Sequence, residues 1–270
     1  MQFAINYSPQ AAELLRAGRI AIDRFKCPEW PDMIATARAL KPVYVHFALD
    51  AGSISGRELD LDVVQSMAAD TDTPCVNMHL VAYARDFPAA PPDTTDTGVT
   101  EIVLRRMIDD VNRVAARVGT DNVIVENIPY FGGGGKYMRA SVDAEVIRRV
   151  VDATGCGFLL DVSHARIAAH HLGVDARAYV ESLPLTRLRE LHLTGVQTID
   201  GRLTDHMGLG DEDWRWAEWA IGEIRRGAWA APWVVALEYG GEGEPFRWRS
   251  DANVIEACAP RLYDMIKGVV

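Results

Sequence analysis

We begin from residues 157–195, which read GFLLDVSHARIAAHHLGVDARAYVESLPLTRLRELHLTG. The stretch opens with the apolar run FLLDV and closes with LRELHLTG, and both have the length and composition of fully buried parallel strands. An Ala-rich helix and a second amphipathic segment lie between them, which is how one parallel strand returns to the next. Each run ends in residue types that bind metals: Asp161 and His164 in the first run, and His192 in the second.

The same alternation of strand and helix signals continues along the whole chain. A chain of 270 residues suits one (β/α)8 barrel, which typically has about 250 residues. We therefore predict an α/β protein with a single TIM-barrel domain over residues 1–270. The expected strands are 3–5, 19–25, 43–49, 75–81, 122–127, 158–162, 188–195 and 233–239. The clearest helices are 59–69, 99–118, 211–226 and 253–267.

Composition excludes several classes of protein. The formal net charge of -10 and the pI near 5.2 argue against a duplex nucleic-acid partner, which normally requires a basic surface. We find no apolar run of about 18 residues and no secretory leader, so we expect no membrane span. The four cysteines are widely spaced without a CxxC pair, which favours a reduced, cytoplasmic protein without a disulfide framework.

Carboxylates and imidazoles recur where the predicted strands end. Active sites of TIM barrels are built at the C-terminal ends of the strands, so these side chains should converge. Imidazole and carboxylate ligands together suit iron, manganese or zinc. A catalytic ion needs only three or four protein ligands, so this number of candidates indicates two or three ions with bridging carboxylates. We expect Asp205 and His206 in the loop after the strand 188–195. The candidates are His46, His79, Glu126, Asp161, His164, His192, Asp205, His206 and Glu238.

These residues have two possible explanations, a structural role in the core and a metal site. A single histidine in a strand is more often a satisfied core or surface residue than a ligand. The carboxylates, however, stand in the apolar runs VIVEN, FLLDV and VVALEY, where an unpaired charge is costly. A metal site or an ion-pair network is therefore required, and we favour the metal. We expect Glu126, Glu238 and His164 to act in catalysis.

Several blocks of the sequence carry a resemblance to a known family. The run 159–195, together with VYVHFALDAG (43–52), VNMHLVAY (76–83), VENIPYF (125–131) and LTDHMGLGDEDW (203–214), is similar to the multinuclear non-haem iron-dependent oxidative enzymes. That family includes the methanobactin-forming oxidase. The resemblance implies a xylose-isomerase-like barrel that holds two or three iron ions. It also implies the use of O2 to rearrange cysteine-derived groups in ribosomally made peptides, often with a separate peptide-recognition partner protein.

The resemblance also implies a division of the ligands. One iron would be bound by His46, His79 and Glu126. A second iron would be bound by Asp161, His192 and Glu238, and a third by His206 with a neighbouring acid. The family usually has Asn where this chain has His164, and it has D-x-H where this chain has the adjacent pair Asp205-His206.

Three other functions fit parts of the same pattern. The D-x-x-H motif of Asp161 and His164, with the segment GLGDEDW, resembles sugar isomerases and epimerases that use one manganese, zinc or cobalt ion. In such an enzyme Glu126 and Glu238 would exchange protons with adjacent substrate carbons. A trinuclear zinc phosphodiesterase similar to endonuclease IV also fits the ligands, although the acidic charge counts against it. The fourth alternative is a barrel that only binds a metal or a partner.

Overall fold

The computed structural model describes residues 1–54 and 60–268. The chain divides into two compact units. The first unit contains residues 1–46, 71–73 and 189–270, and the second contains residues 47–70 and 74–188. Each unit alternates strands with helices, as the sequence predicts. The single domain over residues 1–270 stays a prediction, and Leu59, the expected start of a helix, lies outside the described residues.

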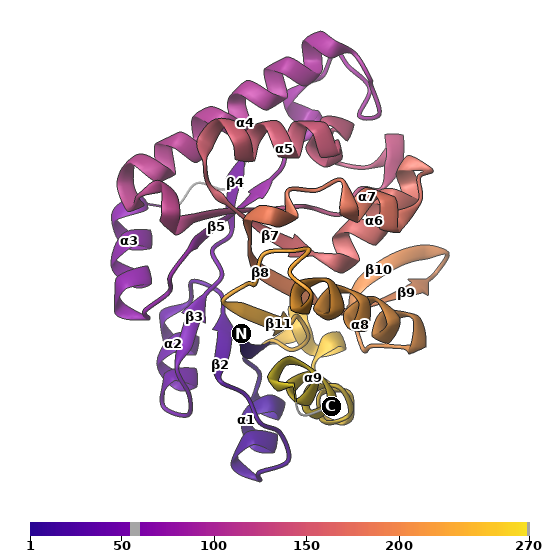
Figure 1. Cartoon of the computed structure of the whole chain (residues 1–270). Helices are drawn as coiled ribbons and strands as arrows, with labels where there is room; N and C mark the ends of the chain where they lie inside the picture. The colour runs from indigo at the N-terminus through magenta and orange to yellow at the C-terminus, as the bar shows by residue number, and fades with distance from the viewer. Residues whose placement is uncertain (55–59, 269–270) are drawn as a thin grey trace. The chain divides into compact units, whose positions relative to one another are not determined.

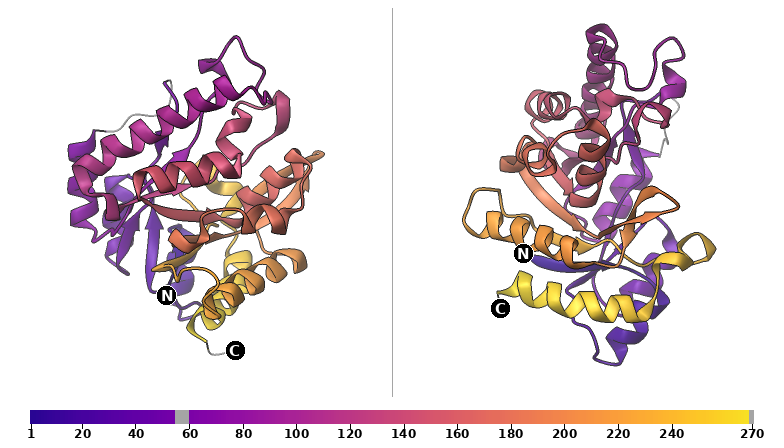
Figure 2. Two further views of the ribbon diagram at one scale, coloured as in Figure 1. Left: turned by 45° about the horizontal axis from the view of Figure 1, so that its top comes forward. Right: turned by 90° about the vertical axis from the view of Figure 1, so that its right-hand side faces the viewer.

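The first unit is built on parallel strands in the order β3-β2-β1-β11-β8. Its helices α8 and α9 lie side by side (Figure 2). The strands are β1 (Gln2–Asn6), β2 (Arg24–Cys27), β3 (Val43–Val45), β8 (Leu188–Leu193), β9 (Gly195–Ile199), β10 (Arg202–Met207) and β11 (Val234–Leu237). The helices are α1 (Pro9–Arg16), α2 (Pro31–Arg38), α8 (Asp211–Arg225), α9 (Ala252–Lys267) and the 3-10 helix η6 (Glu244–Arg249).

The second unit has parallel strands in the order β7-β6-β5-β4. Its longest helix, α4, packs along α5 (Figure 1). The strands are β4 (Leu49–Ala51), β5 (Val76–Leu80), β6 (Val123–Glu126) and β7 (Gly157–Asp161). The α-helices are α3 (Leu61–Asp70), α4 (Thr97–Val118), α5 (Ala144–Thr154), α6 (Val162–Leu172) and α7 (Ala176–Glu181). The 3-10 helices are η1 (Ala84–Asp86), η2 (Thr120–Asn122), η3 (Gly132–Gly134), η4 (Arg139–Val142) and η5 (Leu185–Arg187).

Burial explains why these runs form strands. Every residue of β6, β7 and β11 is buried, as expected for parallel strands that are covered on both faces. In the first unit, Tyr44 packs in a core cluster with Ala4, Val234 and Ala236. No helix of the described residues is long and apolar enough to cross a lipid bilayer.

Two strands differ from their predicted bounds. In both, a side chain makes a hydrogen bond to the backbone in place of a neighbouring strand. The strand expected at 19–25 begins only at Arg24, because the Asp23 carboxylate accepts the N–H of Phe3 at 2.6 Å. The strand expected at 43–49 is split into β3 and β4. The Asn77 amide accepts the N–H of Phe47 at 2.7 Å and donates to its carbonyl at 2.9 Å, so Phe47 does not continue a strand.

Other corrections concern helix starts. The helix α5 is capped by Asp143, whose carboxylate accepts the N–H of Glu145. The nearby Ser141 does not cap this helix and accepts the N–H of Ala82 at 2.8 Å. His164, expected at a strand end, lies in the first turn of α6, because Asp161 both ends β7 and caps that helix.

The segment that carries Asp205 and His206 was expected to be a loop. The structure shows a two-stranded antiparallel hairpin of β9 and β10 instead. The pairing shifts register between Thr204 and Met207, and His206 has a φ of 56°. An irregularity of this kind redirects the side chains next to it, so the hairpin sets the direction of His206.

Gly195 allows the base of this hairpin to close. A Cβ at residue 195 would overlap the backbone carbonyl of Gly208. We expect Gly195→Ala to lower the free energy of unfolding by about 1–3 kcal/mol, the usual cost of overpacking. Thermal or urea unfolding would measure this. The control is Gly222→Ala in α8, where a Cβ meets nothing within 4 Å and alanine favours the helix. Equal stability of the two variants would contradict the expectation.

Candidate functional site

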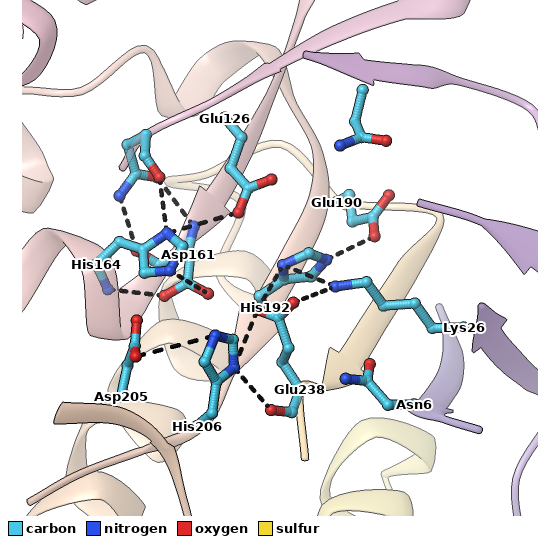
Figure 3. A network of polar contacts seen from close by, with 12 residues as sticks. Asn6, Lys26, Glu126, Asp161, His164, Glu190, His192, Asp205, His206 and Glu238 are labelled. Carbon is cyan, nitrogen blue, oxygen red and sulfur yellow. Dashed lines mark hydrogen bonds and ion pairs between the residues drawn. The ribbon is translucent and has the colours of Figure 1, made fainter. Parts of the chain in front are cut away.

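The nine predicted site residues lie in two groups, one in each unit. Figure 3 labels members of both groups, among them Glu126 and Glu238. We call them the first-unit group and the second-unit group. The first-unit group comprises His46, His192, Asp205, His206 and Glu238, and the second-unit group comprises His79, Glu126, Asp161 and His164. In both groups the residues stand at or just after the C-terminal ends of strands, except where a following helix or hairpin carries them.

Glu126 is the centre of the second-unit group. It ends β6 and is only 1% exposed. His79, from the neighbouring strand β5, places its Nε2 3.3 Å from Glu126 Oε2. His164 places its Nδ1 3.6 Å from Glu126 Oε1. A buried carboxylate with two imidazoles around it is an arrangement that suits a divalent cation.

Asn127 holds the other two members of the second-unit group in place. Its side-chain amide donates to the Asp161 carbonyl and accepts the Asp161 N–H, both at 2.9 Å. Its own carbonyl lies 2.9 Å from His164 Nδ1. Asp161 Oδ1 accepts the N–H of His164, and Asp161 Oδ2 lies 3.8 Å from His164 Nε2. Asn127 thus fixes the backbone of Asp161 and the imidazole of His164. Sequence reasoning did not single out Asn127, although it directly follows Glu126.

Backbone carbonyls fix the tautomers of three imidazoles. A carbonyl only accepts, so the ring nitrogen beside it carries the proton and the other nitrogen keeps the lone pair. His164 Nδ1 meets the Asn127 carbonyl, His79 Nδ1 meets the Leu49 carbonyl at 3.3 Å, and His206 Nδ1 meets the Glu238 carbonyl at 3.1 Å. Metal-binding histidines characteristically make this second hydrogen bond. In each ring the Nε2 atom is therefore set up as the ligand.

The tautomer of His192 is fixed by a carboxylate instead of a backbone carbonyl. It is fully buried, and its Nε2 lies 2.8 Å from Glu190 Oε1, which also accepts a 2.8 Å hydrogen bond from the Tyr44 hydroxyl. Nε2 therefore carries the proton, and the lone pair on Nδ1 faces Glu238 Oε2 at 3.3 Å. His46, Glu190 and His192 also offer ligand atoms that all lie within 4.8 Å of one another. Glu190 was missed by sequence reasoning, although LRELHL places an acid inside a buried run.

Lys26 lies next to the first-unit group, and the sequence did not predict it there. It is 4% exposed at the end of β2, and its Nζ lies 2.6 Å from Glu238 Oε1 and 3.4 Å from His192 Nδ1 (Figure 3). Burial alone raises the pKa of the Glu238 carboxyl, but the Lys26 ammonium, together with the His192 and His206 imidazoles when they are protonated, outweighs burial and holds that pKa well below its usual range. Glu238 is therefore held as a carboxylate. The available signal was a lysine between the apolar residues Phe25 and Cys27, directly after the predicted strand 19–25.

Two other features near the first-unit group make fewer supporting contacts: the adjacent pair Asp205-His206 and the thiol of Cys27. His206 Nε2 lies 3.9 Å from Asp205 Oδ1, so the adjacent pair is close but not in hydrogen-bond contact through these atoms. Cys27 is fully buried, and burial strongly raises the pKa of its thiol. A buried neutral thiol is a poor nucleophile, which argues against catalysis by Cys27.

Both groups fit a metal ion by the chemistry of their donors. Buried carboxylates are costly unless a charge or strong hydrogen bonds compensate them. Here they face imidazoles whose tautomers are fixed by second acceptors, and this oxygen and nitrogen set suits iron, manganese, zinc or cobalt. Each group contains at least three donors, the number that a catalytic ion with one open position requires.

Comparison with known protein families shows which family the chain belongs to. The model of the RiPP precursor modification enzymes MbnB/TglH/ChrH matches residues 26–221. The chain belongs to this family. The match confirms the resemblance seen in the sequence. A UPF0276 protein of Paraburkholderia phytofirmans is 47% identical over 53 residues, which are 20% of this chain and only 17% of that relative.

Solved structures confirm the fold class. The D-psicose 3-epimerase of Clostridium cellulolyticum H10, solved with D-tagatose, has a TM-score of 0.59 at 16% identity and covers 100% of this chain and 99% of its own. A family 2 AP endonuclease from Brucella melitensis has a TM-score of 0.58 at 15% identity, with 96% and 98% covered. The chain thus has the predicted α/β fold of the xylose-isomerase-like TIM barrels. At these identities the likeness concerns the fold alone.

The hydrogen bond from His192 to Glu190 generates a prediction. Glu190→Leu keeps the bulk of the side chain but removes the acceptor that fixes the His192 tautomer. We expect metal affinity to fall roughly 10–100-fold, the usual effect of losing such a partner. Competition with a chelator of known affinity would measure it. Tyr44→Phe removes only the hydroxyl donor to Glu190 and should have a smaller effect. Unchanged affinity in Glu190→Leu would remove His192 from the metal ligands.

Proposed function

We propose that the chain is an iron-dependent oxidative enzyme that uses O2 to modify a cysteine-derived group in a peptide or small molecule. Family membership supports a peptide substrate, and a separate peptide-recognition protein is the partner that the family suggests. The donor set supports iron, because mixed imidazole and carboxylate ligands with open positions are typical of non-haem iron enzymes. The observation that carries the proposal is the pattern of fixed tautomers in His79, His164, His192 and His206.

We propose two or three iron ions per chain. The second-unit group has four donor residues and the first-unit group has five, while three suffice for an ion that keeps an open position. When bound, iron supplies the activation of O2 and the electron transfer. The residues of the chain hold the ligands in place and keep them in the required protonation states. Lys26 does so for Glu238, because its ammonium at 2.6 Å favours the carboxylate form.

Within this function the three proposed catalytic residues have distinct tasks. Glu126 lies 3.3 Å from His79 Nε2 and 3.6 Å from His164 Nδ1, and its carboxylate would serve as a ligand. His164 Nε2 keeps its lone pair because Nδ1 donates to the Asn127 carbonyl. Glu238 stays ionised and faces the Nδ1 atom of His192. These three residues are only 1–8% exposed. Burial therefore keeps water from competing for their ligand atoms.

The second candidate is a sugar isomerase or epimerase with one manganese, zinc or cobalt ion. The likeness to the D-psicose 3-epimerase fold favours it. Glu126 and Glu238 would then transfer protons at adjacent carbons. We rank it second because the family match is a likeness of sequence, whereas a shared fold hosts many activities. A phosphodiesterase acting on duplex DNA ranks third, because the net charge of -10 opposes binding to a polyanion.

Metal content tests the first two candidates directly. After anaerobic purification from a host supplied with iron, we expect two or three irons per chain by elemental analysis. Glu126→Gln keeps the shape but removes the charge, so it should lose at least one iron. The control Glu145→Gln changes an exposed glutamate of the same unit that pairs with Arg148 and should bind as much iron as the wild type. One manganese, zinc or cobalt per chain would favour the epimerase.

Oxygen dependence provides a second test. The iron-loaded protein should consume O2 when it is given a cysteine-containing peptide substrate, and product should fall to background under strict anaerobiosis. An oxygen electrode and mass spectrometry of the peptide would follow both quantities. The protein loaded with manganese should not interconvert D-tagatose and its epimers. Anaerobic epimerisation of such a sugar at a catalytic rate would contradict the oxidative function.

A further inference from the structure

The first unit contains a pocket next to Glu238 that the proposed chemistry does not explain. The pocket opens between the ends of β1 and β2 and the segment that follows β11. Its apolar lining includes Tyr7, Cys27, Met33 and Phe246, while Lys26, His46, Glu238 and Arg249 supply its polar groups. Ligand sites commonly combine an apolar lining with a few placed polar groups.

Arg249, the last residue of η6, is a polar group of this pocket that the proposed chemistry does not use. Its guanidinium lies 4.7 Å from the centre of the Phe246 ring. Burial lowers its pKa, and the charges of Glu238 and Asp205 oppose that shift. Its Nε atom is buried and has no hydrogen-bond partner among the described residues. A buried donor without an acceptor is unfavourable, so a ligand that supplies the acceptor would recover this loss.

The charges of the pocket indicate the sign of that ligand. Glu238 is already paired with Lys26 at 2.6 Å, so these two charges offset each other. Glu238 and Asp205 attract Arg249, but neither gives its Nε atom a hydrogen bond. The Nε–H of Arg249 therefore still requires an acceptor, and an anionic ligand would supply one. A dianionic phosphate would meet repulsion from the neighbouring carboxylates, whereas a carboxylate carries one charge and matches the guanidinium geometry.

The backbone keeps this arrangement in place. Gly240 has a φ of 114°, a conformation that favours glycine. A Cβ at Gly241 would overlap Phe246, the ring on which Arg249 stacks. The glycine pair after Glu238 thus makes room for the wall that positions the guanidinium.

We propose that this pocket binds a carboxylate of the substrate through Arg249. The inference rests on the proposed function only in taking the pocket as the place where substrate enters. Arg249 then selects substrates that carry an acid group near the atom to be modified, with Phe246 and Met33 contacting the apolar part beside it. The acid can come from a chain terminus or from an acidic side chain, and the two sources differ in how far the carboxylate stands from the backbone.

Binding of small probes to the iron-loaded protein, kept anaerobic, tests the proposal without turnover. N-acetylalanine represents a terminal carboxylate, N-acetylaspartate α-amide represents a side-chain carboxylate, and N-acetylalaninamide is the neutral counterpart. By calorimetry we expect at least one acid probe to bind, and the neutral probe to bind at least tenfold more weakly. Arg249→Gln should weaken the acid probe about tenfold or more, while Arg249→Lys, which keeps the charge, should lose less.

The control is Arg261→Gln, which removes an exposed guanidinium of the same unit that pairs with Glu218 and should leave probe binding unchanged. Iron content of each variant separates this proposal from the proposed function, because Arg249→Gln should keep its iron. Equal binding of the acid probe by wild type and Arg249→Gln would overturn the proposal, since the probe would then be held elsewhere, for example by iron. Tighter binding of inorganic phosphate than of either acid probe would also overturn it.

Discussion

Four carboxylates, those of Glu126, Asp161, Glu190 and Glu238, are at least 92% buried at strand ends or inside a strand. Burial of an ion costs several kcal/mol unless a nearby charge or strong hydrogen bonds compensate it. Each of these carboxylates faces an imidazole, and Glu238 also faces the Lys26 ammonium. The need to compensate buried charge therefore explains why histidines gather at the same strand ends. A bound metal ion would satisfy the same need more completely.

The backbone contributes as much to the site as the side chains do. The carbonyls of Leu49, Asn127 and Glu238 each accept from an imidazole Nδ1, and each belongs to a strand end or to a residue beside one. A rigid acceptor of this kind fixes both the tautomer and the direction of the ring. The ligand atoms are consequently pre-oriented, which reduces the entropy lost when a metal binds.

Family and fold give different kinds of information about this chain. The family match is a likeness of sequence over residues 26–221, while the fold is shared with proteins of other activities, among them an epimerase and an endonuclease. Three side chains of this chain lie close to its candidate ligands: Lys26 beside Glu238, Glu190 beside His192, and Arg249 in the pocket next to Glu238. Lys26 favours the carboxylate form of Glu238 and Glu190 orients His192, and an activity has to be argued from such local chemistry because a fold alone hosts many activities.

The sequence by itself determined the alternation of parallel strands and helices and the place of the acids and histidines at strand ends. Apolar runs such as VIVEN and FLLDV specify buried strands locally, because side-chain periodicity is a short-range property. Only the tertiary structure decided which groups meet. Lys26 and Glu238 are 212 residues apart, Asn77 interrupts a strand by bonding Phe47, and the β9–β10 hairpin replaces an expected loop. Such pairings depend on contacts between distant segments, which local patterns do not encode.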